Sequence, residues 1–141
     1  MTQRVQHDAF DWRFGFTPQV ITDNTAAVSA IIDTQGYSSC AFAIITGTLA
    51  DADATFTILV EDGADSGLSD AAAVADTFLD PTEATASFTF ADDSKVRLIS
   101  YKGPKRYVRL TCTPANNSGN APLACLVALG RPHEAPTTTN A

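Results

Sequence analysis

Apolar and polar residues alternate with a period of two along much of this chain. In residues 54–62, Phe56, Ile58 and Val60 alternate with polar side chains, which is typical of a half-buried strand. In residues 40–45 both parities are apolar, which predicts a central strand that is covered on both faces. Residues 54–62 are one of seven expected strands, which are separated by turn-like segments. The others lie at residues 26–33, 38–47, 86–90, 95–101, 106–113 and 123–130.

These elements indicate the fold class. Residues 63–81 are rich in Gly, Ser, Asp and Ala, and we interpret them as a long connection between two sheets. Seven or eight strands, one long crossover and almost no helix predict an all-β fold, an antiparallel β-sandwich of jelly-roll-like arrangement whose strand order stays open. The inward faces predict a core of Phe42, Ile44, Phe56, Ile58, Val60, Leu98, Val108, Leu110 and Val127.

The two ends of the chain differ from its middle. Phe10, Trp12, Phe14 and Phe16 lie at every second position, so an extended segment carries one aromatic face. This segment is either the first strand of the sandwich or an arm that lays its aromatic face on a neighbouring chain. The C-terminal residues are rich in Pro and Thr and lack a core pattern. We therefore divide the chain into an extended N-terminal arm (1–17), a β-sandwich domain (18–130) and a C-terminal tail (131–141).

The cations are concentrated in one stretch. Five of the nine Lys and Arg residues lie between residues 95 and 106, and Arg109 follows. We expect residues 95–101 and 106–113 to form a hairpin with a five-residue loop, which places Leu98 opposite Leu110 on the inward face. The loop and the outward face would then carry Arg97, Tyr101, Lys102, Lys105, Arg106, Tyr107 and Arg109.

The charge of the whole chain bears on what this basic hairpin could bind. Residues 51–93 hold eleven acidic side chains and no Lys or Arg, and the formal net charge is −7. Tyrosine and arginine can stack on bases, but such an acidic chain repels phosphate at long range, so nucleic acid is disfavoured. A basic and an acidic half on one molecule are better suited to contacts with subunits or protein partners. We interpret the basic hairpin and the aromatic segment as docking surfaces.

Residues that would indicate an enzyme or a metal site are missing from the pattern. The sequence has no GxSxG, HExxH, P-loop or GxGxxG motif, so we expect no catalytic residues and no cofactor. Asp62, Asp65 and Asp70 could surround a calcium ion, but their spacing matches no EF-hand loop, so we expect no metal.

The cysteines and the hydropathy bear on where the chain is found. The three cysteines lie in apolar strand-like runs, which predicts buried free thiols and folding in a reducing cytoplasm. No apolar run has the length of a membrane span, and the first residues do not have the pattern of a signal peptide. We therefore expect no membrane partner and no export by that route.

Three stretches carry a resemblance to a known class of proteins. They are IDTQGYSSCAFAIITGTLADADATFTILVEDGADSGLSDAAAVAD, DDSKVRLISYKGPKRYVRLTCTP and LVALGRPHEAP. Together they resemble small proteins encoded in the head modules of tailed bacteriophages and prophages, some of which are capsid decoration or cement proteins. The resemblance covers roughly residues 26–136, leaves out the aromatic segment and carries no catalytic motif.

The resemblance implies a structural protein of the virion that binds and stabilises the head lattice. Its partners would be the major capsid protein or other virion proteins, and it would form a homo-oligomer on the particle. Two alternatives stay open: a head–tail connector or tail component, and a carbohydrate-binding or adhesion module of the kind that sandwiches often display. The carbohydrate alternative would depend on exposed aromatic residues, for which the candidates are Trp12, Tyr101 and Tyr107.

Overall fold

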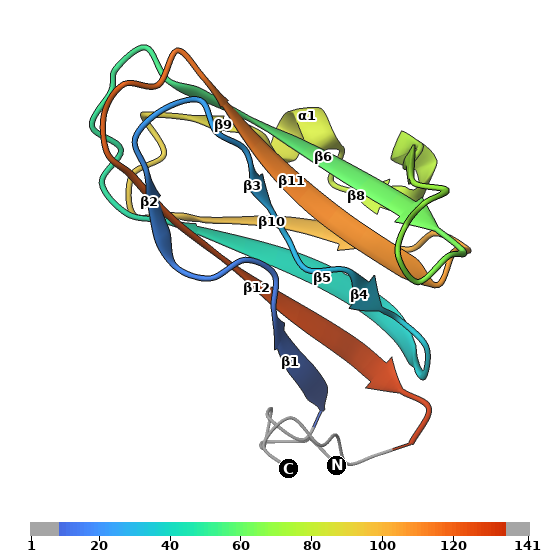
Figure 1. The fold of residues 1–141 in the computed structure, drawn as a ribbon. Coiled ribbons are helices and arrows are strands. Elements are labelled where there is room, and N and C mark those ends of the chain that lie inside the picture. The colour runs from blue at the N-terminus through green and yellow to red at the C-terminus, as the bar shows by residue number, and fades with distance from the viewer. Residues whose placement is uncertain (1–8, 135–141) are drawn as a thin grey trace.

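A computed structural model describes residues 9–134 as two antiparallel β-sheets packed face to face (Figure 1). The predicted all-β antiparallel sandwich is confirmed. Sheet A contains β1 (Phe10–Phe14), β2 (Gln19–Ile21), β5 (Tyr37–Thr46), β8 (Leu79–Asp80), β10 (Val96–Tyr101) and β12 (Ala121–Pro132). Sheet B contains β3 (Ala27–Val28), β4 (Ile32–Asp33), β6 (Thr55–Gly63), β7 (Ala72–Ala73), β9 (Phe88–Thr89) and β11 (Tyr107–Ala115). A 3-10 turn, η1 (Asp76–Phe78), and a short helix, α1 (Glu83–Ala86), lie between the strands.

The strand order places long strands at the centre of each sheet. Sheet A has the order β1-β12-β5-β10-β8, and β2 pairs with the start of β12. Sheet B has the order β3-β11-β6-β7, with β4 also on β11 and β9 also on β6. The expected strand over residues 26–33 is thus divided into the two short strands β3 and β4. The sandwich begins with β1 and extends through the end of β12 at Pro132.

The five long strands alternate between the two sheets along the chain. β5, β10 and β12 belong to sheet A, whereas β6 and β11 belong to sheet B. Because consecutive long strands lie in different sheets, the predicted hairpin of residues 95–101 and 106–113 is wrong. β10 pairs with β5, which places Leu98 opposite Ala43, and β11 pairs with β6, which places Leu110 opposite Val60.

The predicted core is confirmed with one exception. The buried side chains, each at most 2% exposed, include Phe42, Ile44, Phe56, Ile58, Val60, Val108, Leu110 and Val127. Leu98 is 56% exposed, so its predicted burial is wrong. Each parity of β10 contains two apolar or aromatic residues, and the pairing of β10 with β5 turns Ile99 and Tyr101 inward instead. The aromatic rings of Phe56 and Phe88 stack at 4.8 Å within this core.

The expectation that residues 40–45 are covered on both faces is also wrong. The inward side chains of β5 are buried, but Ala41 and Ala43 are only half-buried and Ile45 is 42% exposed. A strand covered on one face normally alternates apolar and polar residues, and β5 does not. Packing in the core of this sandwich therefore does not explain the apolar residues on the outer face of β5.

The three cysteines are free and buried, as predicted. Burial raises the pKa of Cys40, Cys112 and Cys125 to about 12 each, which keeps the thiols protonated and unreactive at neutral pH.

We expect a thiol reagent to modify none of the three cysteines in native buffer and all of them in denaturant. Mass spectrometry of the alkylated protein measures this, and rapid modification in native buffer would show that the strands open locally.

Candidate functional site

The structure does not bring the predicted docking residues together on one surface, and two separate surfaces each carry several of them. One is the connection from β10 to β11, residues 102–106, which we call the lysine loop. The other is the outer side of sheet A, where β1 presents its aromatic residues. The two surfaces come from different parts of the predicted site.

Arg106, at the end of the lysine loop, is paired within the molecule. Its Nε and Nη2 each donate a hydrogen bond of 2.8 Å to a carboxylate oxygen of Asp33, at the end of β4. This hydrogen bond lowers the pKa of Asp33, and the guanidinium carbon lies 5.0 Å from the ring centroid of Tyr107. The charge of Arg106 is therefore matched locally, because a planar guanidinium binds a carboxylate through two parallel donors.

Two further arginines of the predicted site are also paired. Arg109 Nη2 donates a 3.0 Å hydrogen bond to Glu61, its cross-strand neighbour on β6. Arg97 Nη1 lies 3.6 Å from a carboxylate oxygen of Asp92. Arg97 Nη2 also donates a 2.6 Å hydrogen bond to the carbonyl of Thr85 in α1. These contacts connect secondary-structure elements, so neither guanidinium is available as an isolated charge.

Lys102 and Lys105 are the two exposed cations of the lysine loop that remain. Within residues 9–134, neither lysine makes an ion pair with a carboxylate. The ammonium groups of the lysine loop therefore extend into solvent from an otherwise acidic molecule. They are the part of the predicted basic surface that can still attract an acidic partner.

Tyr101 holds the lysine loop from inside, so its predicted outward position is wrong. The side chain is only 4% exposed. Its hydroxyl donates a hydrogen bond of 2.7 Å to Asp62 and accepts one of 3.0 Å from the backbone N–H of Lys105. Burial and the Asp62 contact raise the pKa of Tyr101. A Cβ atom on Gly103 would lie 2.5 Å from the Tyr101 ring, so the loop can approach the ring this closely only with glycine.

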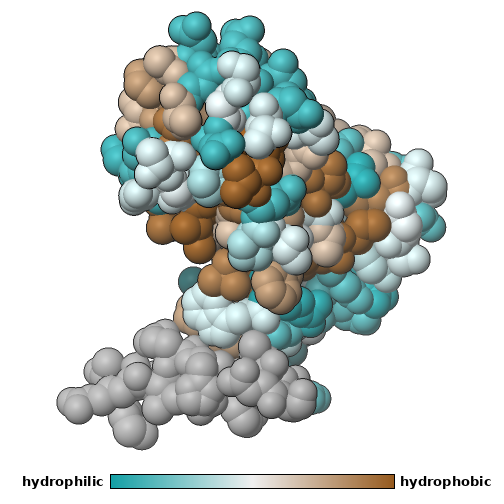
Figure 2. Space-filling model, turned by 60° about the vertical axis from the view of Figure 1, so that its left-hand side comes forward, coloured by the Kyte–Doolittle hydropathy of each residue, from teal (hydrophilic) through white to brown (hydrophobic). Residues whose placement is uncertain are grey.

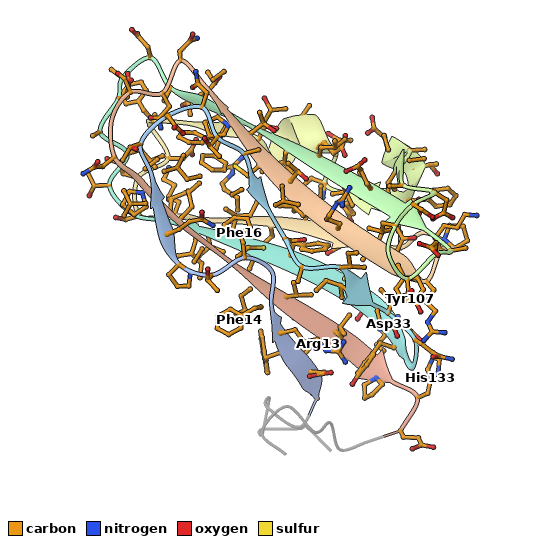
Figure 3. All side chains as sticks on the ribbon, in the orientation of Figure 1. Arg13, Phe14, Phe16, Asp33, Tyr107 and His133 are labelled. Carbon is orange, nitrogen blue, oxygen red and sulfur yellow. The ribbon has the colours of Figure 1, made fainter. Side chains whose placement is uncertain are left out.

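A small cleft of about 110 Å³ lies between the lysine loop and the start of β5, lined by Thr34, residues 37–40 and residues 101–103. At the same end, Ser38 Oγ lies 3.3 Å from Nε2 of His133, and Figure 3 shows His133 near Asp33 and Tyr107. Sequence reasoning missed this contact because 95 residues separate the two. Among residues 9–134, no carboxylate hydrogen bonds to His133, so the orienting group of a Ser–His catalytic pair is not seen there. The other histidine, His7, lies outside the described residues.

Two of the three aspartates considered for calcium, Asp65 and Asp70, accept hydrogen bonds from backbone N–H groups of their own loop. Asp70 accepts hydrogen bonds from the N–H groups of Ala64 and Asp65, and Asp65 accepts from Gly67 and Ser69. These backbone contacts lower the pKa of both carboxyl groups. In the described part of the chain, no three His, Cys, Asp or Glu side chains gather as metal ligands would. No helix in that part is both long enough and apolar enough to span a membrane.

The aromatic segment forms the edge strand of sheet A. β1 pairs with β12, which confirms the interpretation of residues 10–14 as an ordinary first strand. Phe14 is 65% exposed outside the sheets, whereas Phe16 is buried between them (Figure 3). The chain turns at Gly15, whose N–H donates a 2.8 Å hydrogen bond to the carbonyl of Cys125, and this turn directs Phe16 inward. Docking of the aromatic segment on another chain stays a prediction.

The exposed residues of β1 continue across sheet A as one apolar surface. The registers place Phe14 beside Leu126, Leu126 beside Ala43, and Ala43 beside Leu98. Neighbouring rows add further apolar residues, with Trp12 at the border beside Ala128. We call this surface the apolar face; it consists of Phe14, Ala41, Ala43, Ile45, Val96, Leu98, Ala124, Leu126 and Ala128.

The two sheets of this sandwich have different outer faces. The outward positions of β6 and β11 carry mainly polar residues, namely Thr55, Thr57, Glu61, Arg109, Thr111 and Thr113. That composition is normal for a solvated sheet face. The apolar residues on the outer side of sheet A are bordered by one charged residue, Asp80, which lies beside Ser100 at the β8 edge. In the view of Figure 2, hydrophobic side chains reach the surface across the middle of the molecule. The sequence signal of this face is the apolar residues at both parities in β5 and β12; in residues 40–45 that pattern predicts burial on both faces, and the structure shows an exposed outer side instead.

A shallow groove borders the apolar face at its β2 end. It has a volume of about 400 Å³ and is lined by residues that include Val20, Ile45, Pro122 and Ala124. Val20 is 56% exposed. The apolar character of sheet A therefore extends beyond the four strands β1, β12, β5 and β10.

No protein-family model and no curated protein sequence matches this chain. The arrangement of the described residues therefore has to indicate the function. Two features of the surface stand out in it: the apolar face of sheet A and an end loop with two exposed lysines.

Proposed function

We propose that this chain is a structural protein of a bacteriophage virion, specifically a decoration or cement protein that binds the head lattice. The observation that carries the proposal is the apolar face, which spans four strands of sheet A. Large apolar patches on a soluble domain mark contacts with other macromolecules. A rigid sandwich with such a face is suited to assembly, and the resemblance of residues 26–136 to phage head proteins supports the same class.

The lysine loop supplies a second contact in this proposal. Lys102 and Lys105 lie at the end of the sandwich, away from the centre of the apolar face. Two exposed ammonium groups attract an acidic surface, and they act mainly on the rate of encounter and on its salt dependence. The partner is the major capsid protein or another virion protein that presents carboxylates to this loop.

Changing both lysines of the loop to glutamine is expected to weaken binding to purified heads by about tenfold at low salt. The loss should become smaller as salt rises, because counterions screen exposed charges. Occupancy of Lys102→Gln/Lys105→Gln protein on isolated heads, measured by quantitative gel analysis, checks this. Arg106 is unsuitable for the test, because its replacement would also remove the ion pair with Asp33.

Lys95→Gln/Arg131→Gln is the matched control for this experiment. It removes two exposed cations outside the lysine loop and makes the net charge equally more negative. Of these two, Lys95 has only a long contact of 3.9 Å with Asp92, and Arg131 lies on β12 at the same end of the sandwich as the loop. Normal occupancy of the control together with reduced occupancy of the loop variant supports a local role of the lysine loop. Equal occupancy of wild type and loop variant at low salt contradicts that role.

The two alternative functions lead to different observations. A head–tail connector or tail component would bind isolated tails or connectors rather than heads. A carbohydrate-binding module would need its aromatic residues on one platform. Trp12 lies on sheet A, Tyr107 lies on sheet B, and Tyr101 is buried, so these three residues form no common platform. Specific binding on a glycan array without binding to heads would favour the carbohydrate alternative.

A further inference from the structure

We propose that the apolar face binds a second copy of this chain, sheet A against sheet A, in a two-fold symmetric dimer. This inference rests on the face that carries the proposed function, but it concerns the protein in solution before it meets a particle. The identity of the occupant follows from three properties of the molecule: the area of the face, the distribution of charge and the sizes of the side chains.

The area of the face approaches what one partner of a stable dimer contributes. Five large apolar side chains are 42–65% exposed on this side of sheet A: Phe14, Val20, Ile45, Val96 and Leu98. With the half-buried alanines and Leu126, they expose on the order of 600 Å², which is as large as the largest patch on a typical monomer. A stable complex buries about 800 Å² on each partner.

The distribution of charge favours a second copy in this orientation. Each copy has a net charge of −7, so two copies repel each other unless their carboxylates stay apart. The acidic segment 51–93 builds β6, β7 and β9 of sheet B, whereas it contributes only the two-residue edge strand β8 to sheet A. The one carboxylate that β8 places on the outer side of sheet A, that of Asp80, lies at the edge of the sheet beside Ser100. Stacking sheet A on sheet A places the two copies of sheet B on the outside, each separated from the contact by a sheet spacing of about 10 Å.

The side-chain sizes on the face are complementary to one another. The central strands β5 and β12 present four alanines, with one large residue on each strand, Ile45 and Leu126, whereas the flanking strands β1 and β10 present large apolar side chains. In a two-fold symmetric contact, each copy contributes both small and large residues to the interface. The small residues of one sheet can then leave room for the large residues of the opposing sheet. The contact would then have the apolar centre and the absence of central charge that are typical of homodimers.

A different dimer could form through the edge of sheet A. β1 is an edge strand, and edge strands can pair with those of another molecule to continue a sheet. A substitution of Leu98 distinguishes the two dimers, because Leu98 lies on β10, and β12 and β5 lie between β10 and β1. A charge at position 98 would disrupt face-to-face stacking and leave pairing through β1 intact.

Sedimentation velocity of the full chain tests the inference. We expect wild-type protein at micromolar concentration to sediment with twice the monomer mass of 14.9 kDa. Leu98→Glu should raise the dissociation constant by about 100-fold or more, since it buries two unpaired carboxylates at the contact. Val28→Glu is the matched control: Val28 is 50% exposed on sheet B, so the same change there should leave the dimer intact. Circular dichroism checks the fold of each variant, and Leu98→Ser replaces Leu98→Glu if the latter does not fold.

Monomeric wild-type protein at about 100 µM overturns the inference. A folded Leu98 variant that still dimerises like wild type also overturns it, and in that case the edge of sheet A is the contact. Binding of wild-type protein to isolated heads is measured separately. A monomer that binds heads refutes the dimer and leaves the proposed function standing, whereas a Leu98-dependent dimer that binds no head supports the dimer and refutes the proposed function.

Discussion

Replacing Phe42 by alanine is expected to lower the free energy of unfolding by about 3–5 kcal/mol. Phe42 lies in β5 at the centre of sheet A and is 0% exposed. Its register neighbours are Ile99 on β10 and Val127 on β12, and both are also 0% exposed. Since hydrogen-bonded strands flank Phe42 on both sides, the backbone cannot collapse easily into the cavity that alanine would leave.

Urea unfolding followed by circular dichroism measures this loss. Val28→Ala is the control, because Val28 is apolar but half exposed, and its truncation should cost less than about 0.5 kcal/mol. A loss below about 1 kcal/mol for Phe42→Ala would falsify the assignment of the β5 inward face to the centre of the core.

Replacing Tyr101 by phenylalanine is expected to lower the free energy of unfolding by about 1–3 kcal/mol, the second largest effect that we predict. The ring would stay buried, but Asp62 would lose a 2.7 Å hydrogen bond and the N–H of Lys105 would lose its acceptor. A buried polar group left without a partner costs its full desolvation. The lysine loop should also become more mobile, because the Tyr101 hydroxyl contacts both the N–H and the carbonyl oxygen of Lys105.

Two measurements check the Tyr101 prediction. Urea unfolding gives the loss of stability, and hydrogen exchange of the Lys105 amide reports on the loop and should become faster in the variant. Tyr107→Phe is the matched control, since no hydrogen bond of the Tyr107 hydroxyl is seen among residues 9–134, and the ring can still stack under Arg106. Unchanged exchange at Lys105 in Tyr101→Phe would show that the loop is held by other contacts.

Much of the fold could be predicted because strands have a local signature. Alternation with a period of two located β6 and β11, and runs of apolar residues located β5 and β12, each within a few residues. The core positions predicted in these four strands are buried. Burial on one face of a strand constrains every second residue, so the pattern is already present in a short stretch of sequence. The free buried cysteines followed from the same patterns.

The candidate site was predicted less well, because its members belong to different sheets. The lysine loop was correctly placed between two strands, but its arginines are paired with carboxylates far away in sequence, such as Asp33 and Glu61. Local sequence contains no information on which carboxylate a guanidinium meets across a sheet. The sequence does not reveal the apolar face either, because apolar residues at both parities of residues 40–45 predict a strand covered on both faces, whereas the outer side of that strand is partly exposed.

The pattern of residues alone was enough to predict that this chain forms strands, where the long ones lie and which parity of β6 and β11 is apolar and inward. Which sheet each strand joins and, for β5 and β10, which parity alone faces the core became clear only from the pairing of the strands. The physical reason is that inward-facing periodicity is a property of single strands, whereas pairing depends on contacts between strands distant in sequence. In β10, Leu98 and Ile99 are equally apolar, and the register on β5 alone turned Ile99 into the core and Leu98 onto the apolar face.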